Sequence, residues 1–510
     1  MALFLLSCLS LAKPLASHAQ LFTAGNYAPI PAGSAPAVVI EKAAHVVPSP
    51  RQLRWQQLEL TGFLHFGMNT FTNKEWGDGT ESPSLFNPTS LDAGQWVKAC
   101  KDGGIKQVII TAKHHDGFCL WPSKYTEHSV KSSPWKGGKG DVVREVSDAC
   151  RAQGMGFGVY LSPWDRNSPY FGDSAKYNNY FVNQLTELLT NYGRVDEVWF
   201  DGANGEGPTG RKQVYDFNRW YALIRKLQPT AIIAVMGPDV RWVGTESGYG
   251  REMEWSVVPT DAQRQDKVAA NSQKEAAFAP KNMMEADLGS REKIGQAQAL
   301  VWYPAEIDVS IRPGWFHHPA EDAQVKTPAQ LLDIYNSSVG RNGVLLLNVP
   351  PAKNGLITPQ DIASLQAWKT ALGKTYATNL LKGSTVSGLS ASKVTALLDG
   401  KYDTYWTTTG RDTTATLSFT LPAPQRFDVL QLQENIAVGQ RIEKFVLEYK
   451  HGAEWKTAAA GTTVGYKRIL KFDPIEAQYV RLRITSSRLN PTLSAIGLYR
   501  QAEVAAIPKY

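Results

Sequence analysis

The chain has 510 residues, of which 43% are hydrophobic and 20% are charged, and its formal net charge is +7. This length suits two domains, and the hydrophobic content excludes a disordered or fibrous protein. The basic residues are interspersed with acidic ones and form no run suited to a phosphate backbone, so nucleic-acid binding is not expected.

The first nineteen residues are predicted to be a signal peptide. Leu3 to Leu11 is a short apolar run, and Ser17-His18-Ala19 places small residues before a cleavage point. The run is too short to span a bilayer. We therefore expect an exported protein, periplasmic or extracellular, without stable membrane insertion. Anchoring through Cys8 and the oligomeric state stay open.

Residues 20–45, rich in Ala, Pro and Gly, are expected to form an extended lead-in. From residue 46 to 375, short apolar runs alternate with helix-like segments, which favours an imperfect (β/α)8-like barrel. The predicted strands are Gly62–Phe66, Gln107–Ala112, Gly156–Leu161, Glu197–Phe200, Ala231–Met236, Val301–Pro304 and Gly343–Val349.

Helices are predicted between these runs. In Asp141–Gln153, apolar residues recur at helical spacing, Asp141 can cap the start and Gly154 can close the end. Asp92–Lys101 and Pro359–Leu372 show similar patterns. Residues 376–502 instead alternate apolar and polar side chains between turns, which predicts a C-terminal antiparallel β-sandwich.

Polar or aromatic side chains lie at the ends of four successive predicted strands. Reactive groups of barrel enzymes cluster at the carboxyl ends of strands, so we expect these residues to share a pocket. They are His65, His114, His115, Asp116, Tyr160, Trp164 and Asp201.

Two kinds of hydrolysis fit this set. For a metal site, the adjacent His114 and His115 are expected to diverge to opposite faces of an extended segment, which makes them poor ligands for one ion. Glycoside hydrolysis needs two carboxyl groups. Asp201 suits the nucleophile, whereas spacing alone leaves the acid open among Glu206, Glu246, Glu252, Glu254, Glu285 and Glu306.

The motifs HFGMNTF, EWGDG, TAKHHDGF, EVWFDGA and SVGRNGVLLLNVPP occur in this order between residues 45 and 372. Together they resemble the α-L-fucosidases of glycoside hydrolase family 29. The resemblance implies an exo-glycosidase that releases terminal α-L-fucose from fucosylated oligosaccharides or glycoconjugates with retention, through a covalent fucosyl-enzyme. It implies no cofactor.

By this resemblance Asp201 is the nucleophile. VRWVGTESG resembles the branch that places the acid/base at Glu246 and that prefers α-1,3- or α-1,4-linked fucose. The other residues that the resemblance assigns to substrate binding are His65, Glu75, Trp76, His114, His115, Tyr160, Trp164 and Trp315.

Residues 376–502 resemble a galactose-binding-like sandwich of the discoidin (F5/8 type C) kind, in motifs such as LLDGKYDTYW and YVRLRITSS. Such modules bind sugars or serve as packing partners, and some hold a structural calcium. Two alternatives to a fucosidase remain: a non-catalytic fucose- or glycan-binding protein, and a metal-dependent hydrolase on a similar barrel.

Overall fold

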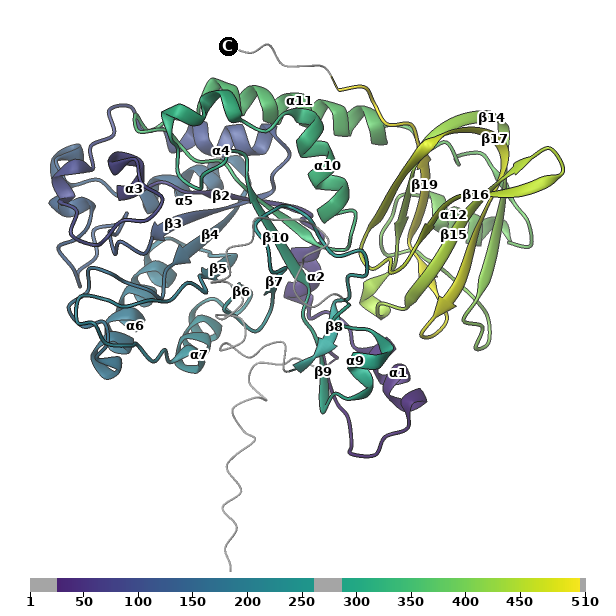
Figure 1. The fold of residues 1–510 in the computed structure, drawn as a ribbon, viewed down its shortest axis with the longest axis horizontal. Coiled ribbons are helices and arrows are strands. Elements are labelled where there is room, and N and C mark those ends of the chain that lie inside the picture. Colours follow the sequence, from purple (N-terminus) through teal and green to yellow (C-terminus); the bar gives the residue numbers. More distant parts are fainter. Residues whose placement is uncertain (1–24, 261–286, 505–510) are drawn as a thin grey trace, which may run out of the picture.

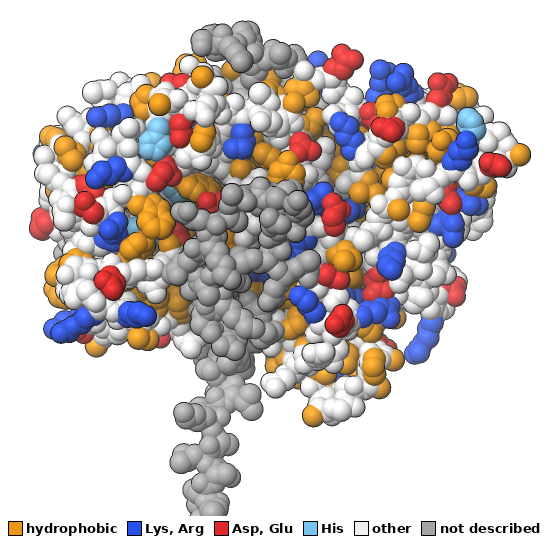
Figure 2. Space-filling view, in the orientation of Figure 1, with side chains coloured by type: hydrophobic (Ala, Val, Ile, Leu, Met, Phe, Trp, Pro, Cys, Tyr) orange, Lys and Arg blue, Asp and Glu red, His pale blue; other side chains and the backbone are white. Residues whose placement is uncertain are grey.

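The computed structural model describes residues 25–260 and 287–504. An eight-stranded parallel barrel is followed by an antiparallel β-sandwich, and the two lie side by side (Figure 1). None of the helices within these two ranges has the length and apolarity needed to cross a membrane. The space-filling view shows acidic and basic side chains mixed over the visible face (Figure 2), in agreement with the small net charge.

The barrel strands follow the order β6-β5-β4-β3-β2-β11-β10-β7. Their bounds are β2 Leu60–Leu64, β3 Gln107–Lys113, β4 Gly156–Leu161, β5 Glu197–Phe200, β6 Ile232–Val235, β7 Arg241–Trp242, β10 Ala305–Ser310 and β11 Val344–Asn348. All neighbouring pairs along this order are parallel. Such strands place their carboxyl ends on one face of the barrel.

The barrel closes weakly between β6 and β7. The two strands meet through an isolated bridge between Ala234 and Val240. Val235, which ends β6, has a φ of 62°, a left-handed conformation that is unusual for a β-branched residue. The expected imperfection of the barrel therefore lies at this junction, because β7 has only two residues.

The predicted strand Val301–Pro304 is wrong as a barrel strand. Ala299–Trp302 forms β9, which pairs with β1 (Tyr27–Pro29) and β8 (Val257–Pro259) in a small antiparallel sheet outside the barrel. The barrel strand β10 follows directly and escaped prediction. Its alternate side chains are polar and buried, namely Glu306, Asp308 and Ser310.

Helices surround the barrel. They are α2 Pro50–Gln56, α3 Met68–Thr72, α4 Ala93–Asp102, α5 Val142–Gln153, α6 Ser174–Asn191, α7 Phe217–Leu227, α10 Pro328–Ser338 and α11 Pro359–Tyr376. Of these, α2 places Trp55 against the interior of the barrel. The prediction for α5 is confirmed: Asp141 accepts a hydrogen bond from Arg144 N, and Gly154 ends the helix with a φ of 67°. Asp92 caps α4 in the same way.

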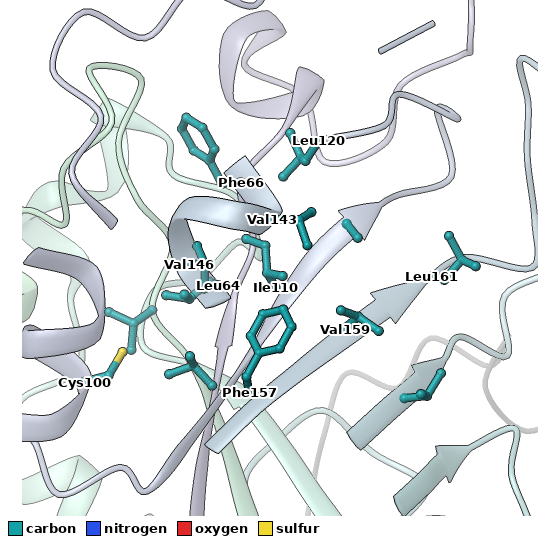
Figure 3. Close-up of a cluster of buried hydrophobic side chains, with 14 of the residues drawn as sticks. Leu64, Phe66, Cys100, Ile110, Leu120, Val143, Val146, Phe157, Val159 and Leu161 are labelled. Atoms are coloured by element: carbon teal, nitrogen blue, oxygen red, sulfur yellow. The ribbon is translucent and has the colours of Figure 1, made fainter. Parts of the chain in front are cut away.

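Buried side chains fill the space between helices and strands. Figure 3 shows Val143 and Val146 of α5 and Cys100 of α4 beside Ile110, Phe157 and other strand residues. Cys100, Cys119 and Cys150 are buried and unpaired. Burial of such apolar area is the main stabilising contribution to this layer.

Two carboxyl groups, those of Glu197 and Glu306, are buried inside the barrel. Glu197 accepts hydrogen bonds from Trp55 Nε1 and Gln107 Nε2, at 3.1 and 2.6 Å. Glu306 accepts one from Trp199 Nε1, at 2.7 Å. Burial raises the pKa of Glu197 to about 7, and burial together with the charge of Glu197 raises the pKa of Glu306 well above its ordinary value. A proton is thus retained in this pair near neutral pH.

The sandwich contains a six-stranded and a two-stranded sheet. Its elements are β12 Thr385–Val386, α12 Ala391–Leu398, β13 Trp406–Thr407, β14 Ala415–Gln433, β15 Ile442–His451, β16 Glu454–Gly461, β17 Arg468–Ser487, β18 Thr492–Leu493 and β19 Ala495–Tyr499. The long strands β14 and β17 pair with each other, and two register shifts interrupt their ladder. The predicted antiparallel sandwich is confirmed.

The sandwich braces the segment next to β7. Gln440, fully buried, accepts from Ser256 N at 2.8 Å and donates to the carbonyl of Glu254 at 3.0 Å. The Glu254 carboxylate in turn forms a buried ion pair with Arg241 of β7. A small subdomain contains α1 (Pro36–His45), α9 (Arg291–Gly295) and the sheet β1-β9-β8. It lies at the lower edge of the molecule in Figure 1.

Candidate active site

A cavity of about 1110 Å³ opens at the carboxyl-terminal ends of the barrel strands. All ten residues assigned above to catalysis or substrate binding line this one cavity. They are His65, Glu75, Trp76, His114, His115, Tyr160, Trp164, Asp201, Glu246 and Trp315. Asp116, also expected there, is instead buried outside the cavity lining. The size of the cavity exceeds that of a typical small-molecule pocket, so it has room for more than one sugar ring.

Asp201 directly follows β5, and its side chain is 22% exposed. Its Oδ2 accepts a hydrogen bond from the Tyr160 hydroxyl at 2.9 Å and lies 3.8 Å from His115 Nε2. Its Oδ1 accepts from Ala203 N at 2.7 Å. These donors fix the orientation of the carboxylate while leaving it open to the cavity, which suits a nucleophile.

Glu246 lies four residues after β7, at the exposed side of the cavity. Its Oε2 accepts a hydrogen bond from Trp315 Nε1 at 3.1 Å. A carboxyl group at the mouth has access to solvent, as a group that exchanges protons with a leaving group and with water requires.

The other acid candidates lie elsewhere. Glu254 is buried between Arg241 and Arg251, and the 63% exposed side chain of Glu252 pairs with Arg341 and Arg468. Glu306 lies beneath Trp199, Glu206 is an exposed residue outside the lining, and Glu285 falls outside the described residues. Of the described candidates, Glu246 is the one that lines the cavity.

The expectation that His114 and His115 diverge is wrong. Their ring centroids are 4.1 Å apart, and both rings line the cavity. β3 ends at Lys113, and the chain turns at once, with Gly117 N donating to His114 O. The alternation of an extended segment therefore does not apply to this pair.

The three cavity histidines are neutral at physiological pH. Burial lowers the pKa of His65 to about 3 and that of His114 well below the ordinary value. Burial also lowers the pKa of His115, although the charge of Asp201 opposes this shift. Neutral imidazoles present one donor and one acceptor each, which suits recognition of hydroxyl groups.

Glu75 binds the loop that carries Trp315. Its carboxylate accepts from the backbone N–H groups of Trp315 and Phe316, at 2.9 and 3.1 Å, and contacts His318 Nε2 at 2.6 Å. A second carboxylate, that of Glu321, accepts from Gly314 N at 3.1 Å. Glu75 therefore positions one wall of the cavity, in addition to lining it.

Aromatic rings form another part of the cavity wall. Trp76 is 53% exposed, and its ring lies 5.4 Å from those of His115 and Trp164. Trp164 is held by a hydrogen bond from its Nε1 to Glu206 O at 3.1 Å. An exposed ring at the mouth of a cavity is well placed to stack on a sugar.

Ten further lining residues were not predicted. They are Phe63, Trp199, Ala203, Asn204, Trp242, Thr245, Asp308, Pro313, Gly314 and Glu321. Phe63 and Trp199 lie two residues before His65 and Asp201, and strand alternation would have identified both. Asp308, a further carboxyl group of the lining, accepts from Trp242 Nε1 at 2.8 Å. Burial, assisted by the charge of Glu246, raises its pKa well above the ordinary value.

Within residues 25–260 and 287–504, no group of three His, Cys, Asp or Glu side chains is arranged to hold a metal ion. The same holds within residues 376–502, for which the resemblance allowed a structural calcium.

Comparisons with known proteins bear on the whole chain. The family model "Alpha-L-fucosidase" matches residues 50–373, and the "F5/8 type C domain" model matches residues 382–497. Alpha-L-fucosidase 1 of Arabidopsis thaliana is 43% identical over 465 residues, which cover 89% of this chain and 87% of that protein.

Solved structures agree with these matches. The structure of a candidate α-L-fucosidase from Bacteroides ovatus has a TM-score of 0.84 and 46% identity, and covers 95% of this chain and 79% of that one. A Ruminococcus gnavus GH29 fucosidase in complex with fucose has a TM-score of 0.79 and 32% identity, with 90% and 95% of the two chains covered. The chain therefore belongs to the α-L-fucosidase family, glycoside hydrolase family 29, and is an α-L-fucosidase that acts on fucosylated glycans.

Proposed function

We propose that this fucosidase is a retaining enzyme in which Asp201 is the nucleophile and Glu246 is the acid/base. The observation that carries the proposal is that these two carboxyl groups, from the ends of different strands, line one cavity together with three neutral histidines. Retaining glycosidases need two such groups flanking the scissile bond.

In the first half-reaction, an Asp201 oxygen attacks the anomeric carbon while Glu246 donates its proton to the departing oxygen. The bond between fucose and the leaving group breaks, and an ester between Asp201 and fucose forms. In the second, Glu246 accepts a proton from water, whose oxygen attacks the same carbon and releases the Asp201 carboxylate. The Tyr160 hydroxyl, 2.9 Å from Asp201 Oδ2, orients the nucleophile and stabilises its charge.

The test of the nucleophile is direct. A 2-deoxy-2-fluoro-fucosyl donor with a good leaving group should label one peptide, and its fragmentation should place the sugar on Asp201. Proton NMR of the first product should show the α-anomer. An Asp201→Asn variant should lose at least about 10⁴-fold in kcat and still bind fucose. Label on another carboxyl group, or initial formation of the β-anomer, would refute the assignment.

Glu246 is tested separately. The Glu246→Ala variant should hydrolyse an activated aryl fucoside, because a good leaving group needs no proton, and added azide should restore turnover by replacing water. The product should be fucosyl azide with retained configuration. The Glu206→Gln variant is the matched control, and it should behave as the wild type because Glu206 lies outside the cavity lining. Failure of azide to accelerate Glu246→Ala would contradict the acid/base role.

We further propose that the substrate is fucose linked α-1,3 or α-1,4 to a branched glycan. The cavity volume of about 1110 Å³ and the exposed Trp76 support space for sugars beyond fucose. A panel of oligosaccharides that differ only in linkage tests this. Higher kcat/KM for α-1,2-linked or aryl fucosides than for the branched isomers would overturn it.

We also propose that the protein is exported and that its activity needs no cofactor. Residues 1–19 carry the features of a cleaved signal, so N-terminal sequencing of the secreted protein should begin near residue 20. Exhaustive EDTA treatment should leave kcat/KM unchanged, because the proposed steps use only carboxyl groups, water and substrate. Loss of activity that added metal restores would instead favour the metal-dependent alternative.

A further inference from the structure

Each cavity histidine uses its Nδ1 atom for a contact behind the ring. This leaves Nε2 as the atom that meets a substrate. The partners of Nδ1 are Asn348 Oδ1 for His65, Asn69 Nδ2 for His114 and Ser162 Oγ for His115, at 2.9, 3.2 and 2.8 Å.

Asn348 determines the tautomer of His65. The Asn348 amide nitrogen donates to the carbonyl of Trp315 at 2.7 Å and to Ser310 Oγ at 2.9 Å, so its oxygen must face His65. That oxygen also accepts from the backbone N–H of His65 at 3.3 Å. Nδ1 of the neutral ring therefore carries the hydrogen, and Nε2 has a free lone pair.

Asn69 imposes the opposite tautomer on His114. Its amide nitrogen donates to the carbonyl of Glu75 at 3.0 Å, which excludes the flipped amide because two carbonyl oxygens would then face each other. The second amide hydrogen points to His114 Nδ1, which must accept it. The ring hydrogen of His114 is therefore on Nε2.

Ser162 determines the tautomer of His115. A hydroxyl group has one hydrogen, and that of Ser162 is donated to the carbonyl of Trp164 at 2.6 Å. Ser162 Oγ can then only accept from His115 Nδ1. The Nε2 atom of His115 therefore presents a lone pair, 3.8 Å from the Asp201 carboxylate.

We propose, on the basis of the fucosidase function above, that Asn348, Asn69 and Ser162 are positioning residues that give the cavity an acceptor–donor–acceptor pattern at His65, His114 and His115. The sugar hydroxyls that face His65 and His115 must then donate a hydrogen, and the hydroxyl that faces His114 must accept one. The site thereby distinguishes hydroxyl groups from groups of the same size that only accept, and does so differently at each position.

The tautomers are measurable without turnover. Two-bond ¹H–¹⁵N spectra of protein labelled with ¹⁵N-histidine, assigned with single His→Gln variants, should show Nδ1–H for His65 and His115 and Nε2–H for His114. The Asn69→Ala variant should convert His114 to a mixture and leave the other two unchanged. Ser162→Ala should do the same for His115 alone, and provides a second test if one variant does not fold. Nδ1–H at His114 in the unaltered protein would overturn the proposal.

Recognition is tested with L-fucose and its 2-, 3- and 4-deoxyfluoro analogues as competitive inhibitors, since these free sugars are not hydrolysed. Fluorine accepts weakly and cannot donate, so the analogue fluorinated opposite His114 should lose the least affinity. The others should bind about 10-fold more weakly than fucose, as expected for one lost hydrogen bond. In Asn69→Ala the advantage of that analogue should disappear. Equal losses for all three analogues would refute the pattern, while retained turnover and labelling at Asp201 would leave the proposed function intact.

Discussion

The indole nitrogen of Trp315 donates a hydrogen bond of 3.1 Å to Oε2 of Glu246. Trp315 is itself held through its backbone N–H by Glu75, at 2.9 Å. A carboxylate from the loop after α3 thus reaches the proposed acid/base through one tryptophan. This connection makes the position of Glu246 depend on residues that contribute no catalytic group of their own.

Replacement of Trp315 by Phe should keep the ring and remove the donor. We expect kcat/KM to fall about 10-fold, which corresponds to one hydrogen bond to a charged group. The limb of the pH profile that reports the general acid should move to higher pH, because the carboxylate form loses a donor. Trp455→Phe, in the sandwich, should leave both unchanged. An unaltered profile in Trp315→Phe would show that the contact has no catalytic role.

Replacement of Glu75 by Gln should weaken the anchor of the Trp315 loop. A neutral amide cannot accept two backbone N–H groups and contact His318 as the carboxylate does. We expect KM for fucosides to rise and kcat/KM to fall about 10- to 100-fold, with little change in melting temperature since the loop lies at the surface. The fluorescence of Trp315, obtained as the difference between each protein and its Trp315→Phe counterpart, reports the position of the loop. Normal kinetics with a displaced loop would separate loop position from catalysis.

A side chain at residue 314 is expected to displace Glu75 and His318. A Cβ atom there would lie 2.7 Å from Glu75 Oε1 and 2.9 Å from His318 Cδ2. Gly314→Ala should therefore disturb the contacts of Glu75 with the Trp315 loop and reduce kcat/KM by about 10-fold or more. Gly373→Ala in α11 is the matched control, because nothing lies within 4 Å of its Cβ, and it should raise stability by about 0.5–1 kcal/mol. Kinetics and thermal denaturation of both variants check the contrast.

The buried pair of Glu197 and Glu306 predicts how stability depends on pH. Both carboxyl groups have a higher pKa in the folded protein than the ordinary 4.5, with Glu197 at about 7. The folded chain therefore holds protons that the unfolded chain releases, so the free energy of unfolding should fall as pH rises from about 4.5 to about 7. The slope for one retained proton approaches about 1.4 kcal/mol per pH unit.

Urea denaturation of the wild type and of Glu306→Gln between pH 5 and 7.5 measures this effect. The Gln amide donates to Glu197 without a titratable proton, so the variant should show a shallower decline. Glu321→Gln, at the exposed loop, should keep the wild-type slope. A steeper decline in Glu306→Gln than in the wild type would contradict the shared proton.

Strand patterns and capping rules predicted six of the eight barrel strands and the site residues at their ends, whereas Glu75, Trp76, Glu246 and Trp315 were assigned by the family resemblance. His65 and Asp201 follow apolar strands directly, and Asp141 and Gly154 delimit α5 as the rules require. These features could be predicted because each depends on residues that are close together in the sequence, within one strand or at the ends of one helix.

The missed features depend on partners far apart in sequence. β10 was overlooked because Glu306 and Asp308 point into the barrel, where Trp199 and Trp242 bind them. These polar residues interrupt the continuous apolar run by which the other barrel strands were identified, although the alternation itself fits a strand. The turn that brings His114 beside His115 likewise follows from where β3 ends, which alternation alone does not reveal.

The bridge between Ala234 and Val240 separates the two proposed catalytic carboxyl groups. Asp201 leaves the wall at β5, on one side of this junction, and Glu246 follows β7 on the other. The distance between the carboxyl groups of Asp201 and Glu246 therefore depends on the span 236–246 and on its contacts with the sandwich. A change in this span would leave the strands that carry the histidines as they are. Lengthening or shortening this span offers evolution, and the protein engineer, a way to admit different leaving groups without rebuilding the pocket for the sugar.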